Sequence, residues 1–401
     1  MMSERLLEGV RVLDFTDFLA GPYCGMYMAD MGADVIKVEN LSSGGNFVRN
    51  ANPKEKTTGR SMYFQNLNRN KRGVALNLKT AEGKELFSEL VKSADVLVEN
   101  NRPGVMEKLG FGWAHCHKLN PGLVYASISG YGQTGIHNRK PGYDLIAQAM
   151  GGSMSITGWP GMEPTRAGQA IGDLYSGMNA CIGILASLLK RKEGGEGQYI
   201  DIALVDSVVS CMEAKLMQYI YTGRNPVMTG NKYITSAPYD SFRAKDGYFV
   251  IASGTDAHFK KFSQAIGMPK LPENPLYCDT PSRQINADSL KSIIEAWAAD
   301  KTSRECIDII DSAGVPAGPI YNCEQICNDK NITETREMLV KLKHPDAGEL
   351  TVIGNPIKMS AYPVQYYKTA PDLGENNDEI FKALGFAKET LDAYRKKGAL
   401  N

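Results

Sequence analysis

The sequence lacks an excess of charge of either sign. Its 401 residues include 45 Lys and Arg against 45 Asp and Glu, so the formal net charge is zero. A neutral chain has no broad electrostatic field that would attract nucleic acid or an anionic membrane surface. We therefore expect no nucleic acid and no membrane among its partners, and we expect any anionic ligand to be held by a local group of basic residues.

Long hydrophobic runs and zinc-site spacings are also lacking. No stretch approaches the roughly twenty apolar residues of a membrane span, and MMSERLLEGVRVLDF has no long apolar segment after a basic one. The one close cysteine pair, Cys323 and Cys327, has no second pair at zinc-site spacing. These absences lead us to expect a cytoplasmic protein with reduced thiols and no metal.

The first third of the chain alternates between two structural periods. Five β-branched, mostly apolar runs are typical of buried strands: residues 10–16, 33–39, 73–79, 94–100 and 123–130. Residues 80–94 have the apolar stripe of an amphipathic helix, with Thr80 as its expected cap. This alternation predicts an α/β fold with a Rossmann-like parallel sheet and a ligand crevice at the carboxyl ends of its strands.

The first strand-to-helix turn, FTDFLAGPYCGMY, lacks the G-x-G-x-x-G fingerprint, which argues against a hydride-transferring dinucleotide enzyme. Residues 197–223 predict a further strand followed by a long helix. Turn-forming residues become frequent after about residue 225. We expect a large domain over residues 1–224, a small inserted α+β domain over 225–329, and a C-terminal segment, 330–401, that returns to the large domain.

The stretch GQAIGDLYSGMNACIGILASLLKRK (168–192) has one acid, Asp173, before Lys190. Asp is a preferred N-cap residue, so the pattern predicts a helix that begins just after Asp173, whose positive end favours the ionised carboxylate. One face of this helix is small and permits close packing, whereas an apolar stripe is expected to anchor it. The small face comprises Gly177, Ala180, Gly183 and Ser187, and the stripe comprises Leu174, Met178, Cys181, Ile182, Leu185 and Leu188 or Leu189.

Ten motifs, in order along nearly the whole chain, resemble those of the class III CoA-transferases, the family of carnitine, bile-acid and formyl-CoA:oxalate CoA-transferases. They include GVRVLDFTDFLAGP, MGADVIKVE, ADVLVENNRPGVMEKLGF, GDLYSGMNACIGILASLL and the C-terminal APDLGENNDEI. The resemblance implies a two-domain chain that forms an interlocked homodimer. It also implies that Asp173 in the GD motif is the nucleophile, with Gly172 leaving the approach path open.

The reaction implied by the resemblance is covalent. Asp173 attacks the thioester of an acyl-CoA, and a mixed anhydride and then an aspartyl-CoA thioester form before a small carboxylic acid takes the CoA. Coenzyme A is a substrate, and this chemistry requires neither a metal nor a redox cofactor. By match to the family pattern, LNLK and VENNRPGVMEK supply the CoA site: Leu76, Leu78, Lys79, Asn100, Arg102 and Lys108, with Lys71 and Arg72 as further candidates.

Two positions depart from the family pattern. Some members have a run of glycines that closes over the site, whereas VIASGTDAHF has the single Gly254. Gly254 remains a candidate substrate contact together with Ser253 and Thr255, and a plain turn is the alternative. Leu19 stands where some relatives have a polar residue that orients the intermediate.

Two other functions remain open. The α-methylacyl-CoA racemases share this fold and use a histidine base in a GHD segment, where this chain has GYD with Tyr143. A phenol is a poor general base at neutral pH, which favours transfer and suggests that Tyr143 positions substrate. A non-catalytic CoA-binding protein is the second alternative, against which the intact Gly172–Asp173 pair argues.

Overall fold

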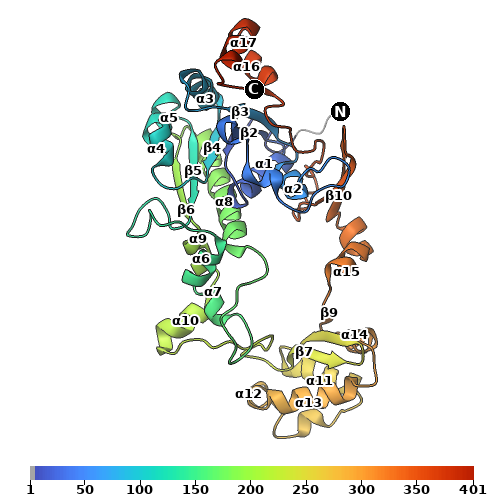
Figure 1. Ribbon diagram of the computed structural model, residues 1–401. Coiled ribbons are helices and arrows are strands. Elements are labelled where there is room, and N and C mark those ends of the chain that lie inside the picture. The colour runs from blue at the N-terminus through green and yellow to red at the C-terminus, as the bar shows by residue number, and fades with distance from the viewer. Residues whose placement is uncertain (1–4) are drawn as a thin grey trace. The chain divides into compact units, whose positions relative to one another are not determined.

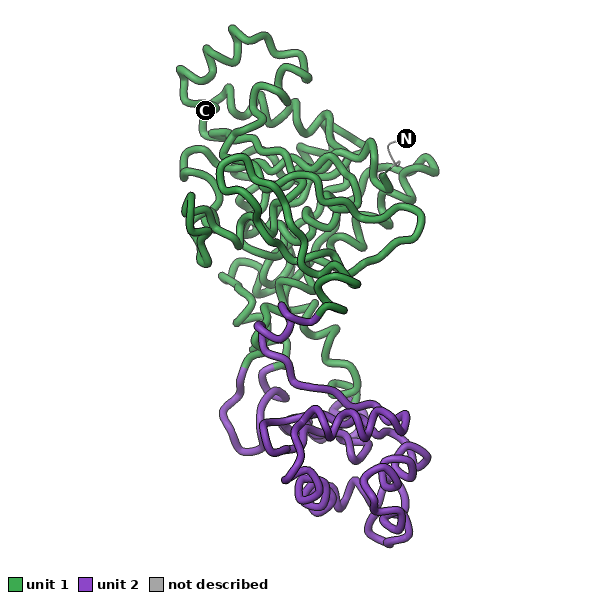
Figure 2. Tube along the Cα trace, turned by 90° about the vertical axis from the view of Figure 1, so that its right-hand side faces the viewer, with its two compact units in different colours: residues 1–153, 166–217, 330–401 green, residues 154–165, 218–329 purple. Residues whose placement is uncertain are grey.

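The structure is a computed structural model that describes residues 5–401. The chain forms two compact units: residues 1–153, 166–217 and 330–401 in unit 1, and 154–165 and 218–329 in unit 2 (Figures 1 and 2). The chain passes between the units along α7 (Ser153–Ile156) and α10 (Glu213–Thr222) and after α15 (Cys323–Asn328).

Unit 1 is built on a six-stranded sheet of order β3-β2-β1-β4-β5-β6, in which every neighbouring pair is parallel. The predicted α/β fold with a parallel sheet is therefore confirmed. The strands are β1 (Arg11–Phe15), β2 (Asp34–Asn40), β3 (Arg72–Leu76), β4 (Val96–Glu99), β5 (Val124–Ser129) and β6 (Tyr199–Ala203).

Helices cover both faces of this sheet because alternate strand residues point to opposite sides. Val96 and Val98 face the core formed with α1 (Ala20–Asp30), α8 (Ile171–Lys192) and α9 (Leu204–Ser210). Leu97 faces a second core, formed with α3 (Ala81–Ser93), α5 (Trp113–Leu119), α16 (Asn377–Ala383) and α17 (Lys388–Lys396). Thr80 caps α3 by accepting the Gly83 N–H, as expected.

The remaining elements of unit 1 lie around these layers. They are η1 (Leu41–Ser43), η2 (Phe47–Asn50), α2 (Met62–Asn68), α4 (Val105–Leu109), α6 (Asp144–Met150), the π-helix η4 (Asn331–Thr335) and the hairpin of β10 (Leu339–His344) and β11 (Gly348–Ile353). At the end of the chain, Leu400 forms an antiparallel bridge to Leu76 of β3.

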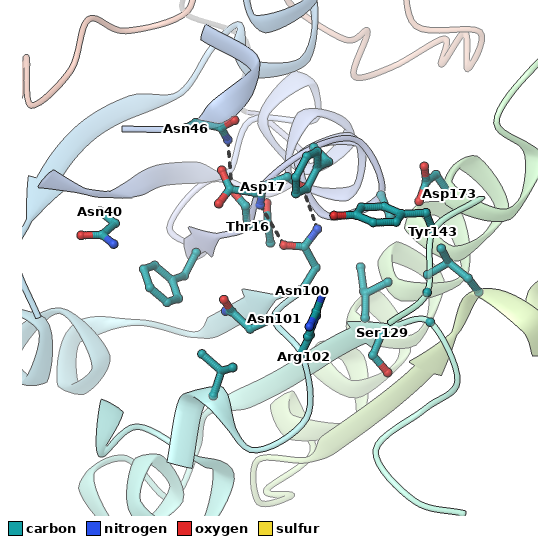
Figure 3. Close-up of a pocket in the computed structure, with 18 of the residues that line it drawn as sticks. Thr16, Asp17, Asn40, Asn46, Asn100, Asn101, Arg102, Ser129, Tyr143 and Asp173 are labelled. Atoms are coloured by element: carbon teal, nitrogen blue, oxygen red, sulfur yellow. Dashed lines mark hydrogen bonds between the residues drawn. The ribbon is translucent and has the colours of Figure 1, made fainter. Parts of the chain in front are cut away.

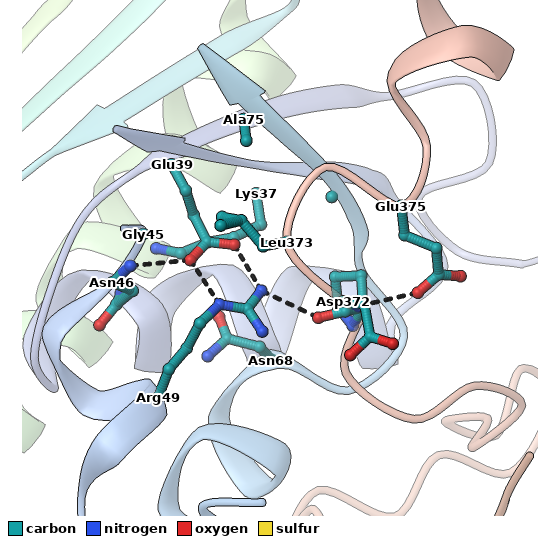
Figure 4. A network of polar contacts seen from close by, with 12 residues as sticks. Lys37, Glu39, Gly45, Asn46, Arg49, Asn68, Ala75, Asp372, Leu373 and Glu375 are labelled. Carbon is teal, nitrogen blue, oxygen red and sulfur yellow. Dashed lines mark hydrogen bonds and ion pairs between the residues drawn. The ribbon is translucent and has the colours of Figure 1, made fainter. Parts of the chain in front are cut away.

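A polar network joins the C-terminal segment to the end of β2 (Figure 4). The Glu39 carboxylate accepts hydrogen bonds from Arg49 Nε at 2.7 Å and from the Asn46 N–H at 2.8 Å. Arg49 also donates to the Pro371 carbonyl at 2.9 Å. Because Glu39 is almost fully buried and ionised groups are costly to bury unpaired, this network fixes the loop after β2.

Unit 2 has an antiparallel sheet of β7 (Tyr239–Ala244), β8 (Gly247–Ala252) and β9 (Ala317–Pro319). Four helices and a short 3₁₀ turn complete it with α15: α11 (Asp256–Ala265), η3 (Leu271–Glu273), α12 (Thr280–Ile285), α13 (Ala287–Ala298) and α14 (Ser303–Ser312). Its core is aromatic and aliphatic, and includes Phe242, Phe249, Phe259, Ile294 and Ile310.

Two sequence-based expectations about helices are wrong. The single long helix expected after β6 is broken into α9 and α10, because Glu213 adopts a left-handed backbone conformation with φ of 46°. In addition, no stretch of membrane-span length was expected, but α8 is long and apolar enough to cross a membrane by length and composition, with a mean hydropathy of 1.2. It packs against α1, β5, β6 and α9 of unit 1 with 39% of this stretch buried, and one such helix is weak evidence for a membrane span.

Candidate active site

Asp173 lies in the first turn of α8, as the third residue of the helix. The prediction that the helix begins just after Asp173 is wrong: the N-cap is Ala170, which has no side-chain capping bond. Asp144, the first residue of α6, satisfies one helix N–H instead, because its Oδ1 accepts from the Gly172 N–H at 2.8 Å. Asp173 is thereby left without a capping role.

The carboxylate of Asp173 makes no hydrogen bond or ion pair within residues 5–401, and it lines a pocket. Desolvation by the surrounding protein raises its pKa, and the negative charge of Asp144 raises it further, to about 7. The helix dipole was expected to favour the ionised form, but burial outweighs it here. Asp173 is therefore an unpaired carboxyl group that changes charge near neutral pH.

Small residues allow the first turns of α8 to approach α6 and α1 closely. A Cβ at Gly172 would lie 3.1 Å from Asp144 Oδ1, and a Cβ at Gly177 would lie 2.5 Å from the Ala20 carbonyl oxygen. The second distance is one that real Cβ atoms essentially never show, so only glycine permits this approach of α8 to α1. The first turn of α8 is consequently held beside the loop that precedes α1.

The pocket has a volume of about 420 Å³ and lies at the carboxyl ends of β1, β2, β4 and β5 (Figure 3). The sheet order places β1 beside both β2 and β4, and such a topological switch point is where parallel sheets bind ligands. Its polar lining residues are Thr16, Asp17, Glu39, Asn40, Ser43, Asn46, Asn100, Asn101, Arg102, Ser129, Tyr143 and Asp173.

Backbone strain and aromatic contacts mark one wall of the pocket. Phe18 has φ of 62°, a left-handed conformation that costs energy for a bulky residue and often occurs at functional sites. Its ring contacts Tyr143 at 5.8 Å and Phe47 at 5.7 Å between centroids. Asn100 fixes the adjacent backbone: its Oδ1 accepts the Asp17 N–H at 2.8 Å and its Nδ2 donates to the Asp17 carbonyl at 2.6 Å.

Four sequence-predicted residues line this one pocket: Asn100, Arg102, Tyr143 and Asp173. The others lie elsewhere. Leu76 and Leu78 are buried in the core beneath α3, Gly172 is buried behind Asp173, and Lys79 and Lys108 are exposed beyond the pocket lining. Gly254 belongs to unit 2, where Ser236 donates to its carbonyl at 3.1 Å and Thr255 caps α11.

The two further candidates for the CoA site, Lys71 and Arg72, have structural partners. Lys71 is fully buried, and its Nζ donates to Asp14 Oδ2 at 2.7 Å, to the Pro22 carbonyl at 3.0 Å and to Asn68 Oδ1 at 3.0 Å. Three acceptors occupy the three N–H groups of the ammonium, so Lys71 has none left for a phosphate of CoA. Arg72 forms ion pairs with Asp34 and Glu379.

The sequence analysis missed several polar residues of the pocket, including Asp17, Asn40, Asn46, Asn101 and Ser129. Most of them follow or end the strands that it predicted, and polar residues at strand carboxyl ends were the available signal. No histidine lines the pocket, and no group of three metal-ligating side chains occurs in the described part of the chain.

A family model described as CoA-transferase family III matches residues 7–377. The chain is 42% identical to succinyl-CoA:mesaconate CoA-transferase of Haloarcula marismortui over 94% of this chain and 96% of that one. It is 37% identical to succinyl-CoA–D-citramalate CoA-transferase of Chloroflexus aurantiacus over 98% of both chains. With formyl-CoA:oxalate CoA-transferase of Streptomyces coelicolor it shares 32% identity over the full length of both.

Solved structures agree with these relatives. A CAIB/BAIF family protein from Brucella suis superposes with a TM-score of 0.85 at 33% identity, over 95% of this chain and 99% of that one. A hypothetical protein from Mycobacterium tuberculosis superposes with a TM-score of 0.83 at 31% identity, over 94% and 99% of the two chains.

Proposed function

The chain belongs to CoA-transferase family III and is a CoA-transferase, and from that premise we propose that Asp173 is its nucleophile. The observation that carries this proposal is the unpaired Asp173 carboxylate in the pocket at the switch point of the sheet. A nucleophilic carboxylate must be ionised and free to approach a carbonyl carbon, and an acid engaged in a cap or an ion pair is not free.

The proposed reaction balances without an external oxidant or reductant. An Asp173 oxygen attacks the thioester carbonyl of the acyl-CoA, which expels CoA thiolate and leaves an aspartyl mixed anhydride. The thiolate then attacks the aspartyl carbonyl, forming aspartyl-CoA and releasing the donor acid. The acceptor carboxylate attacks this thioester, and the returning thiolate attacks the acyl carbon of the new anhydride. The CoA ester of the acceptor leaves, and Asp173 is regenerated.

Basic side chains beside the pocket are proposed to hold the phosphates of CoA. Arg102 lines the pocket and Lys108 lies on α4, which follows the same loop. Neither side chain has an ion-pair partner in the described residues, 5–401, so both charges are available for an anion. Lys79 is a further exposed candidate, and Asn100 contributes by holding the loop backbone.

A racemase reaction is disfavoured by the side chains around Asp173. Such a reaction needs a second group that accepts or delivers a proton at the α-carbon, and histidine is the common choice. Tyr143 contacts Phe18 at the pocket wall, and no histidine of residues 5–401 lines the pocket. We propose that Tyr143 positions the acyl group or the acceptor through its hydroxyl.

The substrates are proposed to be short dicarboxylates and their CoA esters. The relatives are named for succinyl-CoA with mesaconate, D-citramalate or glutarate, and for oxalate. The chain resembles all of them over nearly its whole length, so we propose succinyl-CoA as the donor to test first. Mesaconate, citramalate, glutarate and oxalate are the acceptors to test with it.

We also propose a homodimer. The outward face of α8 exposes Met178, Ile182 and Leu189, with 63% of Ile182 and 67% of Leu189 accessible in the single chain. An exposed apolar face of this kind favours association with another protein surface. A second copy of this chain is the proposed partner, in line with the interlocked homodimer that the family resemblance implies.

The test of the nucleophile is chemical. Protein incubated with succinyl-CoA and little acceptor is expected to accumulate aspartyl-CoA, since the second half-reaction lacks its nucleophile. Hydroxylamine converts this thioester to a hydroxamate, and peptide mass spectrometry is expected to locate the modification at Asp173. Modification of a different acid, or transfer by Asp173→Asn free of deamidated protein above about a tenth of the wild-type rate, would refute the assignment.

A further inference from the structure

Glu99 is a buried acid that the proposed reaction does not use. It ends β4 in the middle of the sheet, paired in register with Phe15 of β1 and Ser127 of β5, and only 3% of it is exposed. Leu97, two residues earlier, points to the core under α3 and α5, so the side chain of Glu99 points to that face too. Glu99 does not line the pocket that contains Asp173.

The carboxylate of Glu99 holds the loop that follows it. Its Oε2 accepts from the Asn101 N–H at 2.7 Å and from Asn101 Nδ2 at 3.2 Å. Ser127, the register partner of Glu99 on β5, lowers the pKa of this carboxyl group. Hydrogen bonds to an ionised carboxylate are stronger than those between neutral groups, so the conformation of Asn101 depends on the charge of Glu99.

The same loop connects the buried face of the sheet to the candidate CoA site. Asn100 is bonded twice to the backbone of Asp17, and Asn101 and Arg102 line the Asp173 pocket. Arg102 also lines the small cavity of Glu99, Tyr125 and Tyr199 on the other side of the loop. The exposed guanidinium of Arg102 has no hydrogen-bond or ion-pair partner in residues 5–401, so the region it can reach is set by where the loop backbone places its Cα.

We propose that Glu99 is a positioning residue: its carboxylate fixes the loop of residues 100–102 in the conformation that presents Arg102 to a phosphate of CoA. This inference rests on the proposed function, because it takes the pocket of Asp173 and Arg102 to be the CoA site. Glu99 has no proposed contact with substrate and acts only through its hydrogen bonds with Asn101.

The surroundings of Glu99 make the strength of its hydrogen bonds with Asn101 depend on pH. Burial raises the pKa of Glu99 to about 7, and the charge of Glu107 on α4 contributes in the same direction. The other titratable or charged groups around it are Tyr125 of β5, Tyr199 of β6 and Arg102 of the loop. Below pH 7 the carboxyl group is protonated and accepts the Asn101 hydrogen bonds less strongly. CoA is therefore expected to bind more tightly above pH 7 than below it.

The experiment measures the Kd of CoA by calorimetry at pH 6 and pH 8 in an Asp173→Asn background, where neither acyl transfer nor Asp173 titration contributes. Glu99→Gln is expected to raise the Kd about five- to tenfold at pH 8, the effect of losing a charge-assisted hydrogen bond. At pH 6 it is expected to change the Kd less than twofold. The titration of CoA itself is common to both proteins and cancels in the comparison.

Two further variants separate positioning from a general change in charge or folding. Glu107→Gln removes a neighbouring negative charge on α4 but no Asn101 hydrogen bond, so the Kd is expected to stay within about twofold. Ser127→Ala removes a neighbouring hydroxyl that lowers the pKa of Glu99, so the pH midpoint of CoA binding is expected to rise. This variant tests the inference even if Glu99→Gln does not fold.

The outcomes distinguish the two proposals. The role of Glu99 is overturned if folded Glu99→Gln protein binds CoA at pH 8 as tightly as the parent protein with Glu99. It is also overturned if Ser127→Ala leaves the pH midpoint of CoA binding unchanged. Either result leaves the transferase proposal intact. Failure of the wild-type protein to bind CoA at either pH overturns the proposed CoA site itself. An effect of Glu107→Gln as large as that of Glu99→Gln shows that charge, and not the hydrogen bonds to Asn101, controls binding.

Discussion

At the scale of the residue, the two neighbouring acids of the site, Asp144 and Asp173, have different roles. Asp144 lies at the start of α6 and uses its oxygens for the Gly172 N–H and for Gln148, at 2.8 Å each. Asp173, one residue beyond Gly172, is left without such bonds. Because a carboxylate that is poorly solvated is a stronger nucleophile than one that is stabilised by donors, this division suits Asp173 to attack a thioester.

The first prediction follows from the pKa of Asp173. A raised pKa of about 7 means that the ionised form increases as pH rises through 7, so the rate of aspartyl-CoA formation is expected to rise over pH 6–8. Asp144→Asn keeps the acceptor for the Gly172 N–H but removes a negative charge that raises this pKa. The midpoint of the single-turnover pH profile is therefore expected to move to lower pH.

Asp206→Asn is the matched control, since Asp206 is an exposed acid on the neighbouring helix α9. Its profile is expected to coincide with that of the wild-type protein. A midpoint that does not move in Asp144→Asn would show that Asp144 has no electrostatic influence on the reacting carboxyl group.

The second prediction concerns the phosphate site. Arg102→Ala and Lys108→Ala are expected to raise the KM for succinyl-CoA about tenfold and to change kcat much less, because phosphates far from the reacting carbon are bound equally in ground and transition states. Lys84→Ala on α3 is the control, an exposed lysine without an ion pair in residues 5–401. Unchanged KM in both site variants would place the phosphates elsewhere.

At the scale of the element, α8 is positioned by small and large residues together, with glycine at its contact with α1. The buried residues of this helix are Gly172, Ser176, Gly177, Ala180, Cys181, Ile184 and Leu188. Met178 and Ile182, which the sequence analysis assigned to an anchoring stripe, are exposed in the single chain, and that assignment is wrong for them. Gly177 is buried at the contact with α1 because that approach leaves no room for a larger side chain, whereas Gly183 and Ser187 of the small face are only partly buried.

The burial of α8 shows which features of the helices and strands can be predicted from the sequence. β-branched runs at strand length identified β1 to β6, because a parallel sheet covered on both faces requires them. The spacing of α8 predicted a helix but could not say which face is buried, since small and large apolar residues both suit a core. Likewise, the N-cap was misplaced because Asp144, almost thirty residues away in sequence, provides the capping oxygen.

The third prediction compares two glycines of α8. Gly177→Ala would place a Cβ 2.5 Å from the Ala20 carbonyl, so the two helices must separate, at a cost of about 1–3 kcal/mol. Because Asp173 lies one turn before Gly177, we also expect turnover to fall about 10- to 100-fold. Thermal unfolding and steady-state kinetics measure the two effects.

Gly183→Ala provides the control on the same helix. A Cβ at Gly183 would meet Ile200 at 3.4 Å, an ordinary contact, and alanine favours helix by about 1 kcal/mol over glycine. This variant is therefore expected to be as stable as the wild-type protein or more so, and fully active. Equal effects of the two substitutions would contradict the proposed role of the α1–α8 contact.

At the scale of the whole molecule, the chain builds unit 1 from three separate segments. Residues 330–401 supply α16, α17 and the Leu400 bridge to β3, and Asn376 and Asn377 accept the N–H groups of Gly73 and Ala75 on this edge strand. These contacts span about three hundred residues of sequence and have no local signature. The same holds for Met154–Thr165, which belongs with unit 2 although no compositional change marks it.

The last prediction concerns assembly. The exposed apolar face of α8 is expected to be covered by a second copy, so sedimentation should give a species of twice the chain mass of 43.9 kDa at all protein concentrations examined. Ile182→Asp places a charge in this face and is expected to reduce the dimer fraction, whereas Lys192→Glu, an exposed residue of the same helix, is expected to leave it unchanged. If the dimer is interlocked, it will not dissociate on dilution unless the chains open, so dilution over hours will leave the wild-type species intact. A stable 43.9 kDa monomer that transfers CoA at the full rate would contradict the proposed dimer.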